Sequence, residues 1–141
     1  MNASLWLRIA ALITAMQAIG HFIARPWTPS HDVLATGVVA AMQVHEMHVM
    51  GFDRSLFDFY VGFGMALGVF LAAQAALLWL LAGFARAEPA RARAAIAVFF
   101  AANVAITVLN ALYLFTVPLV MTGIVALCLG IALLAPSSRR T

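Results

Sequence analysis

The chain has 141 residues, of which 65% are hydrophobic and 9% are charged. This composition excludes an ordinary soluble domain, in which about a quarter of the residues are charged. Eight arginines, no lysine and five acidic residues give a net charge of +3, which is too small and too dispersed for a nucleic-acid-binding protein. The single cysteine, Cys128, lies in an apolar run, so no disulfide framework or thiolate metal cluster is expected. The composition predicts one all-α domain embedded in a membrane.

Four apolar stretches are long enough to cross a membrane, because a hydrocarbon core about 30 Å thick needs roughly 20 residues of helix. The predicted spans are residues 5–24, 57–84, 94–115 and 117–135. The first ends before Pro26, since proline disfavours helical backbone at the preceding residue. Pro118 suits the first turn of the fourth span, and Thr116 is its predicted cap. The predicted fold is a four-transmembrane-helix bundle in a single domain, residues 1–141.

The segment between the first two spans is predicted to be an extra interfacial helix over residues 29–51. Thr28-Pro29 is typical of a helix start and Gly51 of a helix stop. A fifth span is the alternative, and the arginines argue against it. With four spans and both termini cytoplasmic, six arginines lie inside and two outside, as the positive-inside rule requires. The helix is therefore expected to be a cap at the outer surface.

Polar residues inside the apolar spans form the predicted ligand-binding set, because each is costly in hydrocarbon. Helical spacing puts Gln17 and His21 on one face of the first span. It puts Asn103, Thr107 and Asn110 in one polar stripe on the third span. Gln74, on the second span, is expected to lie nearer the cytoplasmic side than these polar residues and not to join them. The stripe has two interpretations, interhelical hydrogen bonds that fix helix register or a polar pocket open to the outer leaflet. The set is Gln17, His21, Tyr60, Asn103, Thr107 and Asn110.

The stretch His45-Glu46-Met47-His48 is the candidate metal site. On a helix, His45 and His48 would project from one side, and imidazole pairs bind transition metals or haem iron. Further ligands would have to come from His21 or from a carboxylate such as Asp58. Structural anchoring of the cap is the alternative interpretation. The cofactor is therefore left open between haem b, a transition metal and none.

Ser55 and Asp58 have the spacing of a capping box at the start of the second span. The alternative is that Asp58 is catalytic, with His21 and Asp58 as a general acid–base pair. No nucleophile accompanies them. Whether the chain is an enzyme is left open, and an isomerase acting on a lipophilic molecule is the enzymatic alternative.

A ladder of small residues, Gly64, Gly68 and Ala72, lies on one face of the second span. In lipid such ladders let helix backbones approach closely and gain dispersion contacts. The ladder predicts either a contact within the bundle or the seam of a homo-oligomer.

The motif Phe59-Tyr60-Val61-Gly62-Phe63-Gly64, with Gly68 following and Gly20-His21 closing the first span, resembles small bacterial four-span proteins. The match covers about a third of the chain. The resemblance implies a four-helix bundle in the bacterial inner membrane, and that family carries no established activity. The chain is also similar to haem-b-containing membrane epoxide isomerases, in size and span count alone.

The leading hypothesis is a membrane-embedded binding protein for a small lipophilic ligand. The alternatives are the isomerase and an accessory subunit of a larger membrane complex. The expected partners are membrane lipids, a lipophilic small molecule, and either a second copy of the chain or a larger complex, with no nucleic acid.

Overall fold

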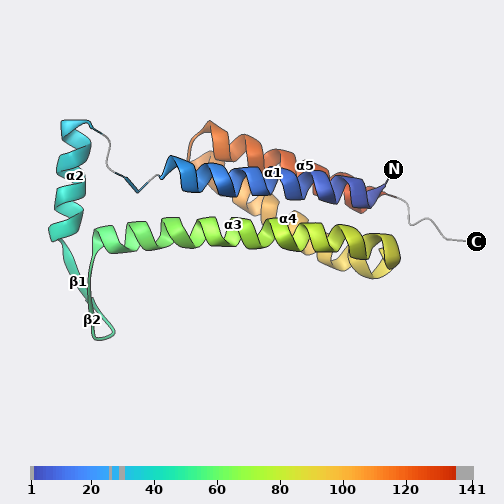
Figure 1. Cartoon of the computed structure of the whole chain (residues 1–141), viewed down its shortest axis with the longest axis horizontal. Coiled ribbons are helices and arrows are strands. Elements are labelled where there is room, and N and C mark those ends of the chain that lie inside the picture. Colours follow the sequence, from blue (N-terminus) through green and yellow to red (C-terminus); the bar gives the residue numbers. More distant parts are fainter. Residues whose placement is uncertain (1, 26, 29–30, 136–141) are drawn as a thin grey trace, which may run out of the picture. The chain divides into compact units, whose positions relative to one another are not determined.

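The computed structural model describes residues 2–25, 27–28 and 31–135. Four of its helices are long and apolar enough to cross a membrane, so the prediction of four long apolar helices is confirmed. In chain order the elements are α1 (Ala3–Ala24), α2 (Val33–Val44), β1 (Glu46–Val49), β2 (Phe52–Ser55), α3 (Leu56–Ala87), α4 (Pro89–Tyr113) and α5 (Thr116–Leu134) (Figure 1).

The helix ends follow the local sequence. α1 ends at Ala24, as predicted, and Arg25 adopts a φ of 42° while its N–H donates to the His21 carbonyl oxygen at 3.2 Å. A residue in the left-handed region is a common way to end a helix. α4 begins at Pro89, earlier than predicted, because proline fits the first helical position. Thr116 is the first residue of α5 and not the predicted cap, which is Phe115.

The chain divides into two compact units. The bundle unit comprises Met1–Ala18 and Leu71–Thr141, and the cap unit comprises Ile19–Phe70. α1 and α3 each contribute to both units.

The bundle unit is built around a continuous apolar core to which α1, α3, α4 and α5 contribute. α4 and α5 pack against each other and are joined by a two-residue connection, residues 114–115. Cys128 is buried in this core among small and branched side chains, as expected for a packing residue. Many core positions are alanines, which allows helices to approach closely without a hydrophobic drive between them.

The cap unit does not contain the single helix predicted over residues 29–51. α2 begins at Val33, where the Asp32 side chain accepts hydrogen bonds from the backbone N–H groups of Leu34 and Ala35. These bonds satisfy donors that the first turn of a helix leaves unpaired. The predicted proline start, Pro29, lies outside the described residues. α2 ends at Val44 and is followed by a β-hairpin.

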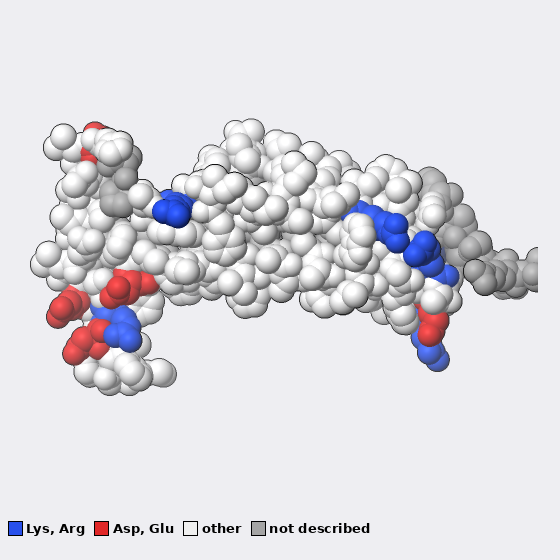
Figure 2. All heavy atoms as spheres, in the orientation of Figure 1, with Lys and Arg blue, Asp and Glu red and all other residues white. Residues whose placement is uncertain are grey.

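The hairpin forms because Met50 and Gly51 make a two-residue turn. Both have positive φ, 52° and 84°, which is the backbone that the favoured two-residue hairpin turn requires. Val49 pairs with Phe52 across the turn, and His48 pairs with Asp53. Charged side chains gather in this part of the chain (Figure 2). Gly51 therefore turns a hairpin, and the prediction that it ends a helix was wrong.

Gly51→Val is expected to open the hairpin locally. A side chain in the left-handed region costs about 1–2 kcal/mol, and a β-branched one is the least tolerated. Hydrogen exchange of the backbone amides of β1 and β2 should accelerate about tenfold, while exchange in α4 and α5 stays unchanged.

Gly37→Ala is the matched control, because Gly37 lies inside α2 with no atom within 4 Å of an added Cβ. It should slow exchange in α2, since alanine is the better helix former. Unchanged exchange in the Gly51→Val hairpin would contradict the turn assignment.

Candidate functional site

The residues of the predicted site are divided between the two units. The bundle unit holds Gln17, half-buried one helical turn before His21, together with the stripe on α4. The cap unit holds the other predicted residues, which are His21, His45, His48, Asp58 and Tyr60.

His21 is the best-defined polar group of the cap unit. Its Nε2 lies 2.7 Å from the carbonyl oxygen of Gly64 on α3. A carbonyl oxygen can only accept, so Nε2 carries the proton and donates. In the neutral imidazole, Nδ1 is then the acceptor. The protein backbone thus fixes both the tautomer and the direction of the ring.

Aromatic rings surround this imidazole. The Trp27 ring centroid lies 5.6 Å from that of His21 and the Phe22 centroid 6.1 Å away, both in edge-on arrangements. Phe22 and Trp27 also contact each other, with centroids 6.4 Å apart. His21 and Trp27 are half-buried. Tyr60 is about as exposed as buried and lies beside Phe57, with ring centroids 6.4 Å apart. His21, Phe22 and Trp27 thus form a cluster, an apolar surface with one fixed polar group.

The small-residue ladder on α3 supports this cluster. A Cβ added at Gly64 would lie 2.8 Å from Cε3 of Trp27, and one added at Gly68 would overlap the ring of Phe22. Both glycines therefore allow an aromatic side chain to lie on the α3 backbone. At these two positions the ladder serves a contact within the chain. Sequence reasoning identified the ladder but did not connect it to Phe22 and Trp27.

The first amide of the α4 stripe ties α3 to α4. Asn103 Oδ1 accepts from Gln74 Nε2 at 3.1 Å, and Asn103 Nδ2 donates to the carbonyl oxygen of Phe99 at 2.8 Å. Thr107 Oγ1 donates to the carbonyl oxygen of Asn103 at 2.7 Å. The expectation that Gln74 lies apart from the stripe was wrong. Gln74 and Asn103 are almost equally far from the connection at Glu88, about 21 Å along either helix.

The second amide ties α4 to α5. Asn110 Nδ2 donates to Thr122 Oγ1 at 3.1 Å and to the carbonyl oxygen of Pro118 at 3.2 Å. Thr122 Oγ1 donates in turn to the Pro118 carbonyl oxygen at 2.8 Å. Asn103 and Asn110 are both buried. Interhelical hydrogen bonding thus accounts for both amides of the stripe.

The two histidines of the candidate metal site do not have the geometry predicted for them. His45 directly follows α2 in extended backbone and His48 lies in β1. Residues three apart in an extended chain point to opposite sides, so the predicted helical pair is not formed. His48 Nδ1 instead lies 2.7 Å from Asp53 Oδ1, in an exposed cross-strand pair. Within the described residues, no three histidine, cysteine or acidic side chains gather as a metal site would require.

The predicted capping box is confirmed. The backbone N–H of Ser55 donates to Asp58 Oδ2 at 2.8 Å, and the backbone N–H of Asp58 donates to Ser55 Oγ at 3.1 Å. Each side chain satisfies a backbone donor at the start of α3. Asp58 therefore has a structural role at the helix N-terminus.

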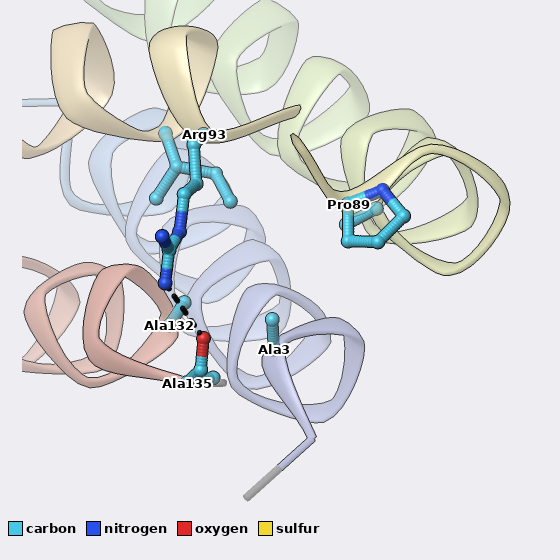
Figure 3. A pocket seen from close by; sticks show the side chains of 7 residues that line it. Ala3, Pro89, Arg93, Ala132 and Ala135 are labelled. Carbon is cyan, nitrogen blue, oxygen red and sulfur yellow. Dashed lines mark hydrogen bonds between the residues drawn. The ribbon is translucent and has the colours of Figure 1, made fainter. Parts of the chain in front are cut away.

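A small pocket lies in the bundle unit, and none of the predicted ligand-binding residues lines it. Figure 3 shows Arg93 crossing it, where Nη2 donates to the carbonyl oxygen of Ala135 at 3.1 Å. This carbonyl follows the end of α5, where the helix leaves acceptors without partners. The remaining walls are small or apolar side chains, Ala3, Ala85, Pro89, Ile96 and Ala132. Arg93 thus joins the start of α4 to the end of α5.

These features define an α-helical protein with four helices able to span a membrane. No family model, curated protein or solved structure matches the chain. The resemblance to small bacterial four-span proteins therefore stays a prediction.

Proposed function

We propose that this chain is an integral membrane protein that binds a small lipophilic molecule at the His21 cluster, defined as His21, Phe22 and Trp27. The observation that carries the proposal is the fixed imidazole of His21. Its Nε2 is held by Gly64 and its ring is surrounded by Phe22 and Trp27. An apolar surface with a few fixed polar groups is typical of sites for small organic ligands.

The tautomer indicates which ligands would bind. With Nε2 donating to Gly64, Nδ1 offers an acceptor, so the ligand should carry a hydroxyl or N–H donor on an apolar body. The amides of Asn103 and Asn110 are used between helices, so in this proposal they hold the bundle and do not orient the ligand.

We place the protein in a bacterial inner membrane with both termini cytoplasmic. The support is the arginine distribution, six against two, together with the apolar length of the four helices. α3 has 32 residues and is about 48 Å long, so it exceeds the hydrocarbon thickness and can extend its first turns into the outer interface. The His21 cluster would then be open to the outer leaflet.

The alternative functions have less support. The accessory-subunit hypothesis requires the ladder and the polar stripe to contact another protein. Aromatic side chains of this chain already cover Gly64 and Gly68, and Gln74 already donates to Asn103. The isomerase hypothesis rests on His21 with Asp58, whose carboxylate accepts the cap hydrogen bond from Ser55. Neither has an observation that favours it over binding.

The binding proposal is tested with two probes, 1-hexadecanol and hexadecyl methyl ether, which share an apolar chain and differ in the hydroxyl donor. Trp27 reports binding by fluorescence in a protein in which Trp6 and Trp79 are replaced by phenylalanine. Hexadecanol should bind about five- to tenfold more tightly than the ether, because a hydrogen bond to a half-buried acceptor contributes about 1–1.5 kcal/mol.

His21→Phe should abolish the preference for the alcohol while keeping apolar contacts. His31→Phe is the control, since it replaces an exposed histidine in the same unit. Equal affinity for both probes in the parent protein, or an unchanged preference in His21→Phe, would contradict the proposal.

A further inference from the structure

Arg8 lies in the apolar helix α1, five residues after its first residue, Ala3, and therefore about 7.5 Å along the helix. Its Nε is buried and has no hydrogen-bond partner among the described residues. A buried donor without an acceptor costs free energy, more so when the group is charged. The Nε–H of Arg8 is therefore a donor that the described part of the chain does not use.

The surroundings of Arg8 are suited to a membrane interface. Its Cζ lies 5.1 Å from the ring centroid of Trp79 on α3, and this ring is about half exposed. Tryptophan is enriched at the level of lipid headgroups. Arg86 follows Trp79 by seven residues, so it lies on the same side of α3 two turns further on. We name Arg8, Trp79 and Arg86 the arginine surface.

The bundle unit leaves this positive charge without an internal counter-charge. Its described residues include four arginines, at positions 8, 86, 91 and 93, and one acid, Glu88, giving 4 − 1 = +3. Glu88 is bonded to Arg91 at 2.7 Å. In the face drawn in Figure 2, the red atoms of this unit lie beside one blue group, and other blue groups have no red neighbour. The uncompensated arginines are the ones that an anion would satisfy.

We infer that the arginine surface binds the phosphate of an anionic phospholipid. Phosphate oxygens match the planar donors of arginine, and such charge-assisted bonds are the stronger class. An anionic headgroup is favoured over a zwitterionic one, because the zwitterionic headgroup also has a positively charged ammonium group, which Arg8 and Arg86 would repel. Basic sites between membrane helices are typical places for anionic headgroups. The inference does not depend on the His21 cluster, which lies in the other unit.

The test uses delipidated full-length protein in dodecyl maltoside and native mass spectrometry. The probes are palmitoyl-oleoyl phosphatidylglycerol, the phosphatidylcholine of the same chains, and inorganic phosphate as a competitor. Phosphatidylglycerol should bind roughly thirtyfold more tightly than phosphatidylcholine, because Arg8 and Arg86 each contribute about 1 kcal/mol of attraction. Inorganic phosphate at equal concentration should not displace it.

Arg8→Gln and Arg86→Gln should each reduce the preference for phosphatidylglycerol about fivefold. Arg91→Gln is the matched control, because Arg91 is already paired with Glu88, and it should keep the preference. If Arg8→Gln does not fold, Arg8→Lys and Arg86→Gln provide the test. Equal binding of the two lipids, or equal losses in Arg86→Gln and Arg91→Gln, would overturn the inference. Displacement of the lipid by inorganic phosphate would show that the site binds a free anion, and this would overturn the inference of a phospholipid site.

Discussion

Replacing Gly68 with alanine is expected to destabilise the cap unit by about 1–3 kcal/mol, the usual cost of overpacking. The added Cβ would overlap three ring atoms of Phe22, so the ring would have to leave its place on α3. Displacing Phe22 also removes an edge contact from His21. The variant should therefore lower both the stability of the cap unit, followed by hydrogen exchange over residues 19–70, and the affinity for hexadecanol.

Two further variants separate the overlap from any general effect of a side chain on α3. Gly62→Ala has no atom within 4 Å of the added Cβ and should be neutral or slightly stabilising. Phe22→Ala combined with Gly68→Ala should recover part of the loss, because the double variant removes the overlap. If Gly62→Ala and Gly68→Ala behave alike, the contact between Phe22 and Gly68 does not exist in the protein.

Asn103→Leu is expected to lower the free energy of unfolding of the bundle unit by about 1–2 kcal/mol. The substitution leaves the Gln74 amide without its partner and deletes the bond to the Phe99 carbonyl oxygen. Hydrogen bonds between membrane helices contribute about 0.6–1.7 kcal/mol. Unfolding by increasing sodium dodecyl sulfate in mixed micelles measures this loss.

The double variant Gln74→Leu and Asn103→Leu tests whether the two amides act as a pair. It should be more stable than the sum of the single losses predicts, because neither helix then buries an unpaired amide. Strict additivity of Gln74→Leu and Asn103→Leu would show that the bond does not couple α3 and α4.

The sequence was sufficient to predict the helical spans and the local caps. Apolar length alone identifies α1, α3, α4 and α5, because in hydrocarbon a single segment can satisfy its own backbone hydrogen bonds only as a helix. The Ser55–Asp58 box was also predictable, since both partners lie within one helical turn. These features depend on residues close together in the chain.

The features that were missed depend on choices that the sequence leaves open. Gly51 is compatible with a helix stop and with a hairpin turn, and only the positive φ at Met50 and Gly51 distinguishes them. The Gln74–Asn103 bond joins two helices, so it depends on how α3 and α4 pack together, which residue spacing along one helix does not determine. The contact of Phe22 with Gly68 joins residues far apart in sequence, so helical periodicity alone cannot predict it.

We propose that His21 offers Nδ1 as an acceptor to a hydroxyl-bearing lipophile. This hydrogen bond is tested most directly by the nitrogen-15 NMR spectrum of histidine-labelled protein in micelles, recorded with hexadecanol and with its methyl ether. We expect the His21 signals to show the Nε2–H tautomer, and the Nδ1 signal to move to lower frequency with the alcohol alone. A protonated Nδ1 in the neutral ring, or the same response to both probes, would contradict the proposed site.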